Sequence, residues 1–159
     1  MDDIDWNARL IGIKGSRGIG KTTFLLNYAK VAGDSKKCLY VDLNNFYFAT
    51  HTIVSLADDF CKLGGHTLLL DQVYKYPDWS NELRQCYDRH PELHIVFAGS
   101  PVMRLKEANP VLNGIVSSYN LRGFSFREFV NLMAGTNFKS YTYDELIKNH
   151  HDIAAEICS

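Results

Sequence analysis

The sequence lacks the features that mark secreted, membrane-spanning and strongly basic proteins. It has only four cysteines in 159 residues, no Cys-x-x-Cys pair, and no run close to 18 apolar residues. Its formal charge is −1 and its longest basic run is Lys36-Lys37, so nothing indicates strong nucleic-acid binding by this chain. Residues 1–5 resemble no signal peptide. We expect a cytoplasmic protein with no membrane contact, whose cysteines are buried thiols rather than disulfides or metal ligands.

What is present suits one well-packed domain spanning residues 1–159. Hydrophobic residues make up 46% of the chain and aromatic residues 13%, enough for a single core. Apolar strand-like runs alternate with helix-like segments, which predicts an α/β fold of three layers with a parallel sheet covered on both faces. The predicted strands are 9–14, 38–43, 67–71, 94–99 and 118–121, and the predicted helices are 21–31, 52–63 and 80–89. Capping boxes at 125–128 and 142–145 predict two later helices, and 134–141 is the one plausible flexible joint.

Residues 15–23 form a phosphate-binding loop of the pattern GxxxxGKT, called the phosphate loop below. A strand-like run precedes it and a helix-like run follows it, which is the context this motif requires. Backbone N–H groups of such a loop surround a polyphosphate at the start of a helix. Lys21 would reach the β and γ phosphates, and the Thr22 hydroxyl would join the shell of a Mg²⁺ ion. The predicted nucleotide-binding residues are Gly15, Ser16, Arg17, Gly18, Ile19, Gly20, Lys21, Thr22 and Thr23, although Arg17 also suits a solvated loop charge.

Polar residues at the ends of three other strands are candidates for the same site. Asp71 ends an apolar strand as a Walker B aspartate does and would hold Mg²⁺; the alternative is a turn-capping aspartate. Ser100 would touch the γ phosphate or the attacking water, or else cap a helix before Pro101. Asp42 would support the Mg²⁺ shell or simply occupy a turn. Strand ends of this kind converge on one edge of an open α/β sheet.

The chain resembles the prokaryotic AAA-type ATPases of the archaeal-type or STAND-related group. Residues 70–77 have the sequence Leu-Asp-Gln-Val-Tyr-Lys-Tyr-Pro. This is similar to the group's Leu-Asp-Glu followed by Val-His-Lys-Tyr-Pro, and residues 124–129 also match the group. The resemblance covers nearly the whole chain and implies the strand order 5-1-4-3-2. It also implies ATP or ADP and Mg²⁺ as ligands, with Lys21 and Thr22 on phosphate and Mg²⁺, Asp71 on Mg²⁺, and Ser100 as the sensor residue.

The chain departs from that group in three ways. Gln72 stands where the group has a glutamate that polarises the attacking water; an amide orients water but takes no proton, and a positioned base typically contributes about 10²–10⁴-fold. Ras-type GTPases nonetheless position water with a glutamine, so Gln72 alone does not exclude turnover. Ile115 stands where relatives commonly carry an arginine. Relatives also extend beyond both ends, so we expect a truncated ATPase core without the C-terminal lid or further domain.

The sequence leaves three functions to weigh. The leading one is a Mg·ATP-binding ATPase domain with catalytic residues Lys21, Gln72 and Ser100 and hydrolysis impaired at Gln72. The second is a nucleotide-controlled interaction module with little turnover, acting through a homo-oligomer or a protein partner. A small-molecule P-loop kinase is less favoured, because no arginine-rich lid is evident in the sequence.

Overall fold

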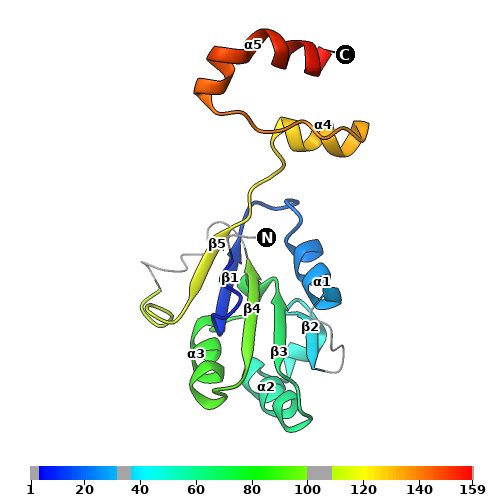
Figure 1. Ribbon diagram of the computed structural model, residues 1–159. Coiled ribbons are helices and arrows are strands. Elements are labelled where there is room, and N and C mark those ends of the chain that lie inside the picture. Colours follow the sequence, from blue (N-terminus) through cyan, green and yellow to red (C-terminus); the bar gives the residue numbers. More distant parts are fainter. Residues whose placement is uncertain (1–3, 32–36, 100–108, 159) are drawn as a thin grey trace. The chain divides into compact units, whose positions relative to one another are not determined.

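The strands form one parallel sheet in the order expected. The computed structural model describes residues 4–31, 37–99 and 109–158. The strands are β1 (Leu10–Lys14), β2 (Cys38–Asp42), β3 (Thr67–Asp71), β4 (His94–Gly99) and β5 (Ser117–Asn120). Their order is β2-β3-β4-β1-β5 and every pairing is parallel (Figure 1). This is the predicted order 5-1-4-3-2 counted from the other edge, so the α/β fold class is confirmed.

Within the described residues up to Arg122, three helices and two short 3₁₀ turns accompany the sheet. The helices are α1 (Lys21–Val31), α2 (Ile53–Lys62) and α3 (Trp79–Arg89), and the turns are η1 (Phe46–Ala49) and η2 (Val73–Lys75). Each predicted strand and helix in this part of the chain lies within one residue of its observed bounds. The helix periodicity and the glycine stops after 31 and 63 were therefore sufficient local signals.

Alternation along the strands divides the core into two layers. Successive strand residues point to opposite faces of a sheet, so odd and even positions pack against different helices. On one face, α1 contributes Leu25 to a cluster with Ile11, Ile13, Leu69, Val96 and Ala98. On the other, α2 and α3 contribute Ile53, Ala57, Leu83 and Cys86 to a cluster with Leu10, Leu68, Leu70, Ile95 and Phe97. Asp71 is two residues beyond Leu69, so its side chain emerges on the α1 face.

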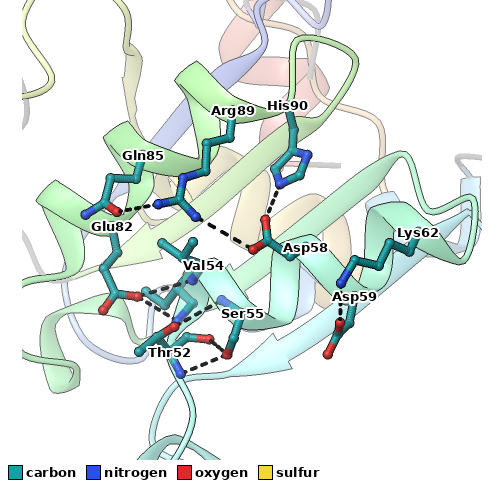
Figure 2. Close-up of polar contacts among 11 residues, drawn as sticks. Thr52, Val54, Ser55, Asp58, Asp59, Lys62, Glu82, Gln85, Arg89 and His90 are labelled. Atoms are coloured by element: carbon teal, nitrogen blue, oxygen red, sulfur yellow. Dashed lines mark hydrogen bonds and ion pairs between the residues drawn. The ribbon is translucent and has the colours of Figure 1, made fainter.

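Polar contacts join α2 to α3 on the other face (Figure 2). Glu82 of α3 accepts hydrogen bonds from the backbone N–H groups of Ile53 at 2.7 Å and Val54 at 3.3 Å, which are unpaired donors of the first turn of α2. Asp58 of α2 pairs with His90 Nε2 at 2.7 Å. The two helices are thus fixed to each other at both ends of their contact, and they cover the sheet as one layer.

The chain divides into two compact units. The sheet unit is Met1–Arg122 and the helical unit is Gly123–Ser159. The helical unit contains α4 (Phe126–Ala134) and α5 (Tyr143–Cys158), the latter with a kink at Asn149. The segment expected to be a flexible joint, 134–141, belongs inside the helical unit, where the side-chain oxygen of Asn131 accepts from the Phe138 backbone N–H at 2.8 Å.

Two expectations from composition can be compared with the described residues. Cys86 is a buried free thiol, whereas Cys38 and Cys61 are half-buried free thiols; burial raises the pKa of all three. The expectation of buried thiols is therefore met fully only at Cys86.

Within the ranges that the structure describes, no helix has the length and apolar character needed to span a membrane.

Candidate nucleotide site

A cavity of about 600 Å³ lies where the strand ends meet the start of α1, and it is called the site cavity here. Ligands of open α/β sheets bind at this edge, beyond the carboxyl ends of the strands. The lining residues come from the phosphate loop, from the turn after β2 and from the ends of β3 and β4. They are Arg17, Gly18, Gly20, Lys21, Thr22, Thr23, Asn44, Asp71, Gln72, Tyr74, Lys75 and Gly99.

The phosphate loop depends on its glycines for two different reasons. Gly18 and Gly20 adopt φ angles of +79° and +97°, which residues other than glycine rarely adopt. At Gly15 there is no room for a side chain, because a Cβ added there would lie 2.7 Å from the Leu121 carbonyl oxygen. Backbone rather than side chains therefore forms the surface of the loop, as close approach to a phosphate requires.

Lys21 is held within the phosphate loop. Its ammonium group donates hydrogen bonds to the carbonyl oxygens of Gly15 and Ser16, both at 2.8 Å. Burial lowers the pKa of Lys21, and the nearby Asp71 carboxylate partly offsets that shift. The site cavity therefore contains a lysine charge anchored to the loop at the start of α1.

Asp71 is a buried carboxylate surrounded by neutral hydrogen-bond donors. It is 2% exposed, and its Oδ2 accepts from the Thr22 hydroxyl at 2.5 Å and from the Tyr40 hydroxyl at 3.0 Å. Its Oδ1 accepts from the Gln72 backbone N–H at 2.8 Å. Burial, followed by the Asp71 charge, raises the pKa of Tyr40, so this hydroxyl keeps its proton and donates.

The oxygen donors at this position fit a magnesium ion. Mg²⁺ prefers hard oxygen ligands, and buried carboxylates ordinarily pair with a cation or coordinate a metal. The hydroxyl of Thr22 and the carboxylate of Asp71 supply such ligands side by side, and the charge of Asp71 is not matched by any cationic hydrogen-bond donor among the described residues.

Gln72 points toward the edge of the sheet. Its backbone is left-handed, with φ 54° and ψ 35°, and its Nε2 donates to Asp42 Oδ2 at 2.8 Å. Asp42 also accepts from the Asn44 backbone N–H through Oδ1 at 2.8 Å, in the way a turn aspartate does. A strained non-glycine backbone beside a site is a frequent functional signature. Asp42 thus combines the turn role considered from the sequence with a bond to Gln72 that the sequence did not indicate.

The other predicted residues divide into three groups. Arg17 and Thr23 line the site cavity, and Arg17 is exposed. Gly15, Ser16 and Ile19 belong to the phosphate loop but are not among the described lining residues. Ser100 lies outside the described residues.

Ile115 packs against the core and is not among the residues that line the site cavity. It is half-buried and lies against the apolar cluster on the α2–α3 face of the sheet. In this chain the position that we aligned with a common arginine therefore contributes to the core.

Four residues near the site were assigned no role from the sequence. Tyr74 and Lys75 line the site cavity and lie in the text at 70–77 that carries the family resemblance, so a signal for them existed. Asn44 follows β2 in a turn of ordinary composition. Tyr40 lies inside a strand, where a tyrosine suggests only packing.

Comparison with known proteins identifies the family. Residues 7–130 match the family described as AAA domain, a segment that includes the phosphate loop, Asp71 and the whole sheet. The chain belongs to the AAA domain family. It is thus an AAA-type P-loop ATPase domain, and its family implies ATP binding.

One solved structure similar to this AAA domain is titled "Structure of C. elegans PCH-2". The two share 18% sequence identity, with a TM-score of 0.47 over 69% of this chain and 34% of that one. The AAA domain therefore spans about a third of the length of that structure. No curated protein matches the sequence.

Proposed function

We propose that this chain binds Mg·ATP in the site cavity and turns it over slowly. The observation that supports this most directly is the contact of the Thr22 hydroxyl with Asp71 at 2.5 Å, because it joins the end of the phosphate loop to the end of β3. Thr22 and Asp71 would hold Mg²⁺, which neutralises phosphate charge when bound. Lys21 would release its bonds to the loop carbonyls and pair with the β and γ phosphates. Ser100, which follows Gly99 in the sequence and lies outside the described residues, is proposed as the sensor residue.

A second cavity supports a whole nucleotide rather than phosphate alone. It has a volume of about 640 Å³ and lies against β1, β5 and α1, with Phe24, Tyr119 and Arg122 among its lining residues. Phe24 directly follows the phosphate loop, and β5 and β3 lie on opposite sides of β1 in the sheet. A nucleotide whose Mg²⁺ lies at Asp71 would thus direct its base toward β5. Apolar and aromatic walls with a few polar groups suit a purine ring.

Slow turnover is proposed from the bond between Gln72 and Asp42. A glutamine takes no proton from water, and this one is engaged by a carboxylate at the sheet edge. Ile115 supplies no charge for the transition state. These two observations favour a nucleotide-controlled interaction module, working through a homo-oligomer or a protein partner, as the second candidate. We also assign the chain to the archaeal-type or STAND-related group, because the sequence of residues 70–77 resembles that group's.

Binding of a fluorescent ATP analogue in the presence of Mg²⁺ tests the site. Lys21→Ala removes the only predicted lysine contact to phosphate and should weaken binding roughly 10- to 100-fold, the effect of losing a charge-assisted contact. Lys30→Ala is the matched control, since Lys30 is exposed in the last turn of α1. Undiminished binding by the Lys21 variant would overturn the assignment of the site.

A second arm of that experiment tests the block on hydrolysis. In Gln72→Glu the new carboxylate would face Asp42, and two like charges at hydrogen-bond distance repel each other. We therefore expect a small gain in phosphate release from that variant, and a gain of about 10²-fold when Asp42→Asn is added to restore a donor. Wild-type turnover in the ordinary range of about 1–10³ s⁻¹ would contradict the proposed impairment.

A further inference from the structure

Tyr40 brings a hydroxyl group to the Walker B carboxylate from the neighbouring strand. It lies in β2 in register with Leu69 of β3, so both side chains are on the α1 face of the sheet. Asp71 lies two residues further along β3 on that same face. The tyrosine ring is long enough to cross this step, and its hydroxyl donates to Asp71 Oδ2 at 3.0 Å.

The hydrogen bonds of Asp71 come from separate parts of the fold. The Thr22 hydroxyl reaches Oδ2 from the first turn of α1, and the Gln72 backbone N–H reaches Oδ1 from the turn after β3. Thr22 is exposed and is itself a proposed metal ligand, so it cannot serve only to orient the carboxylate. Tyr40 is half-buried in the apolar cluster on the α1 face, which fixes its ring.

We propose that Tyr40 is a positioning residue for Mg²⁺ binding, holding the Asp71 carboxylate in the orientation that it needs beside Thr22. This inference rests on the proposed function and adds to it a residue outside the phosphate loop and the Walker B sequence. Groups that hydrogen-bond to a metal ligand commonly set its orientation, and their loss typically costs about 10–100-fold in metal affinity. Asp71 is almost fully buried, so few other donors can take the place of the Tyr40 hydroxyl, and its loss leaves Oδ2 one donor short.

Tyr40→Phe tests this role with little disturbance of packing, because it removes one oxygen and keeps the ring. The measurement is the Mg²⁺ concentration that gives half-maximal enhancement of binding of a fluorescent ATP analogue by the full chain. We expect the variant to need about tenfold more Mg²⁺, while its binding of the analogue in EDTA stays within twofold of the wild type.

Tyr28→Phe is the matched control for loss of a tyrosine hydroxyl on the same face. The Tyr28 ring stacks on Trp6 with centroids 4.4 Å apart, and its hydroxyl is not among the donors to Asp71 in the described part of the chain. It should leave the Mg²⁺ requirement unchanged. If the Tyr40 variant instead lost binding equally with Mg²⁺ and in EDTA, the residue would have a structural role only and the inference would be overturned.

Thr22→Ala separates failure of this inference from failure of the proposed function. If Thr22→Ala raises the Mg²⁺ requirement and Tyr40→Phe does not, the metal site stands and the role of Tyr40 is wrong. If the wild type and the Lys21→Ala variant both fail to bind the analogue under all conditions, the proposed function itself is wrong.

Discussion

The sheet unit and the helical unit differ in how their apolar side chains are placed. In the sheet unit, residues such as Phe97, Leu70 and Leu83 are completely buried. In the helical unit, Ile153 is the one buried side chain among those described, and Phe126 is 83% exposed. The helices α4 and α5 therefore depend more on local signals such as their capping boxes, whereas the sheet requires packing on both faces.

This difference between the two units also bears on where the candidate site lies. The predicted site residues all belong to the sheet unit, where strands buried on both faces deliver Asp71 and Gly99 rigidly to the site cavity. Metal and phosphate sites need such fixed positions. The helical unit instead presents large apolar side chains at its surface, a feature more typical of association than of catalysis.

The largest effect expected from this comparison concerns two phenylalanines. Phe97→Ala in β4 should lower the free energy of unfolding of the sheet unit by about 3–5 kcal/mol, because it leaves a cavity in a closed core. Phe126→Ala in α4 should change it by less than about 0.5 kcal/mol. Urea unfolding followed by tryptophan fluorescence measures the sheet unit alone, since Trp6 and Trp79 both lie there.

The Trp79 ring is 5.7 Å from the Phe97 ring, so it reports directly on the altered core. Far-UV circular dichroism on the same samples gives the helix content of both units. A loss of several kcal/mol in the Phe126 variant would show that the surface of α4 is covered in the folded protein, and the contrast between the units would fail.

A smaller effect is expected from two glycines, one in each unit. Gly15→Ala forces a methyl group to within 2.7 Å of the Leu121 carbonyl oxygen, and overpacking of this kind typically costs about 1–3 kcal/mol. It should also weaken nucleotide binding, since the phosphate loop must shift. Gly123→Ala meets nothing within 4 Å and should leave both stability and binding unchanged. Full nucleotide binding by the Gly15 variant would contradict the close approach seen at this position.

The smallest effect is expected from the helix caps. Ser125→Ala removes the capping box of α4, worth about 1 kcal/mol, and should reduce helix content because little packing supports that helix. Thr52→Ala removes the equivalent box from α2, where Glu82 and the core also hold the first turn. That variant should keep its helix content and lose only a comparable amount of global stability. Circular dichroism distinguishes the two responses.

The α4 cap also predicts a pH dependence. Hydrogen bonds from the Ser125 backbone N–H and then from its hydroxyl lower the pKa of Glu128 below its ordinary value of 4.5. The stabilisation is therefore complete above that ordinary pKa and is lost as the pH falls through the lowered one. Helix content should fall on acidification in the wild type, and this step should be weaker in Glu128→Gln, which removes the titrating carboxylate. An equal step in both would exclude Glu128 as its cause.

Much of the fold could be predicted from the sequence because its signals are local. The phosphate loop, the capping boxes at Ser125 and Thr142, and the alternation of apolar runs each depend on a few neighbouring residues. The division into two units could not be predicted, since it depends on which apolar faces find partners. At the site, the contact between Thr22 and Asp71 was implied by the motifs, whereas the bond of Gln72 to Asp42 and that of Tyr40 to Asp71 were not.

The sequence by itself determined that the chain is an α/β protein with a phosphate loop followed by a strand that ends in an aspartate. Spacing within a few residues specifies those features, so no folded context is needed to read them. Only the tertiary structure decided which groups surround the aspartate and where Gln72 points. Parallel pairing places β2 beside β3. It thereby brings Tyr40 to Asp71, the last residue of β3, and Asp42 to Gln72, the residue that follows it, although each pair is some 30 residues apart in the chain.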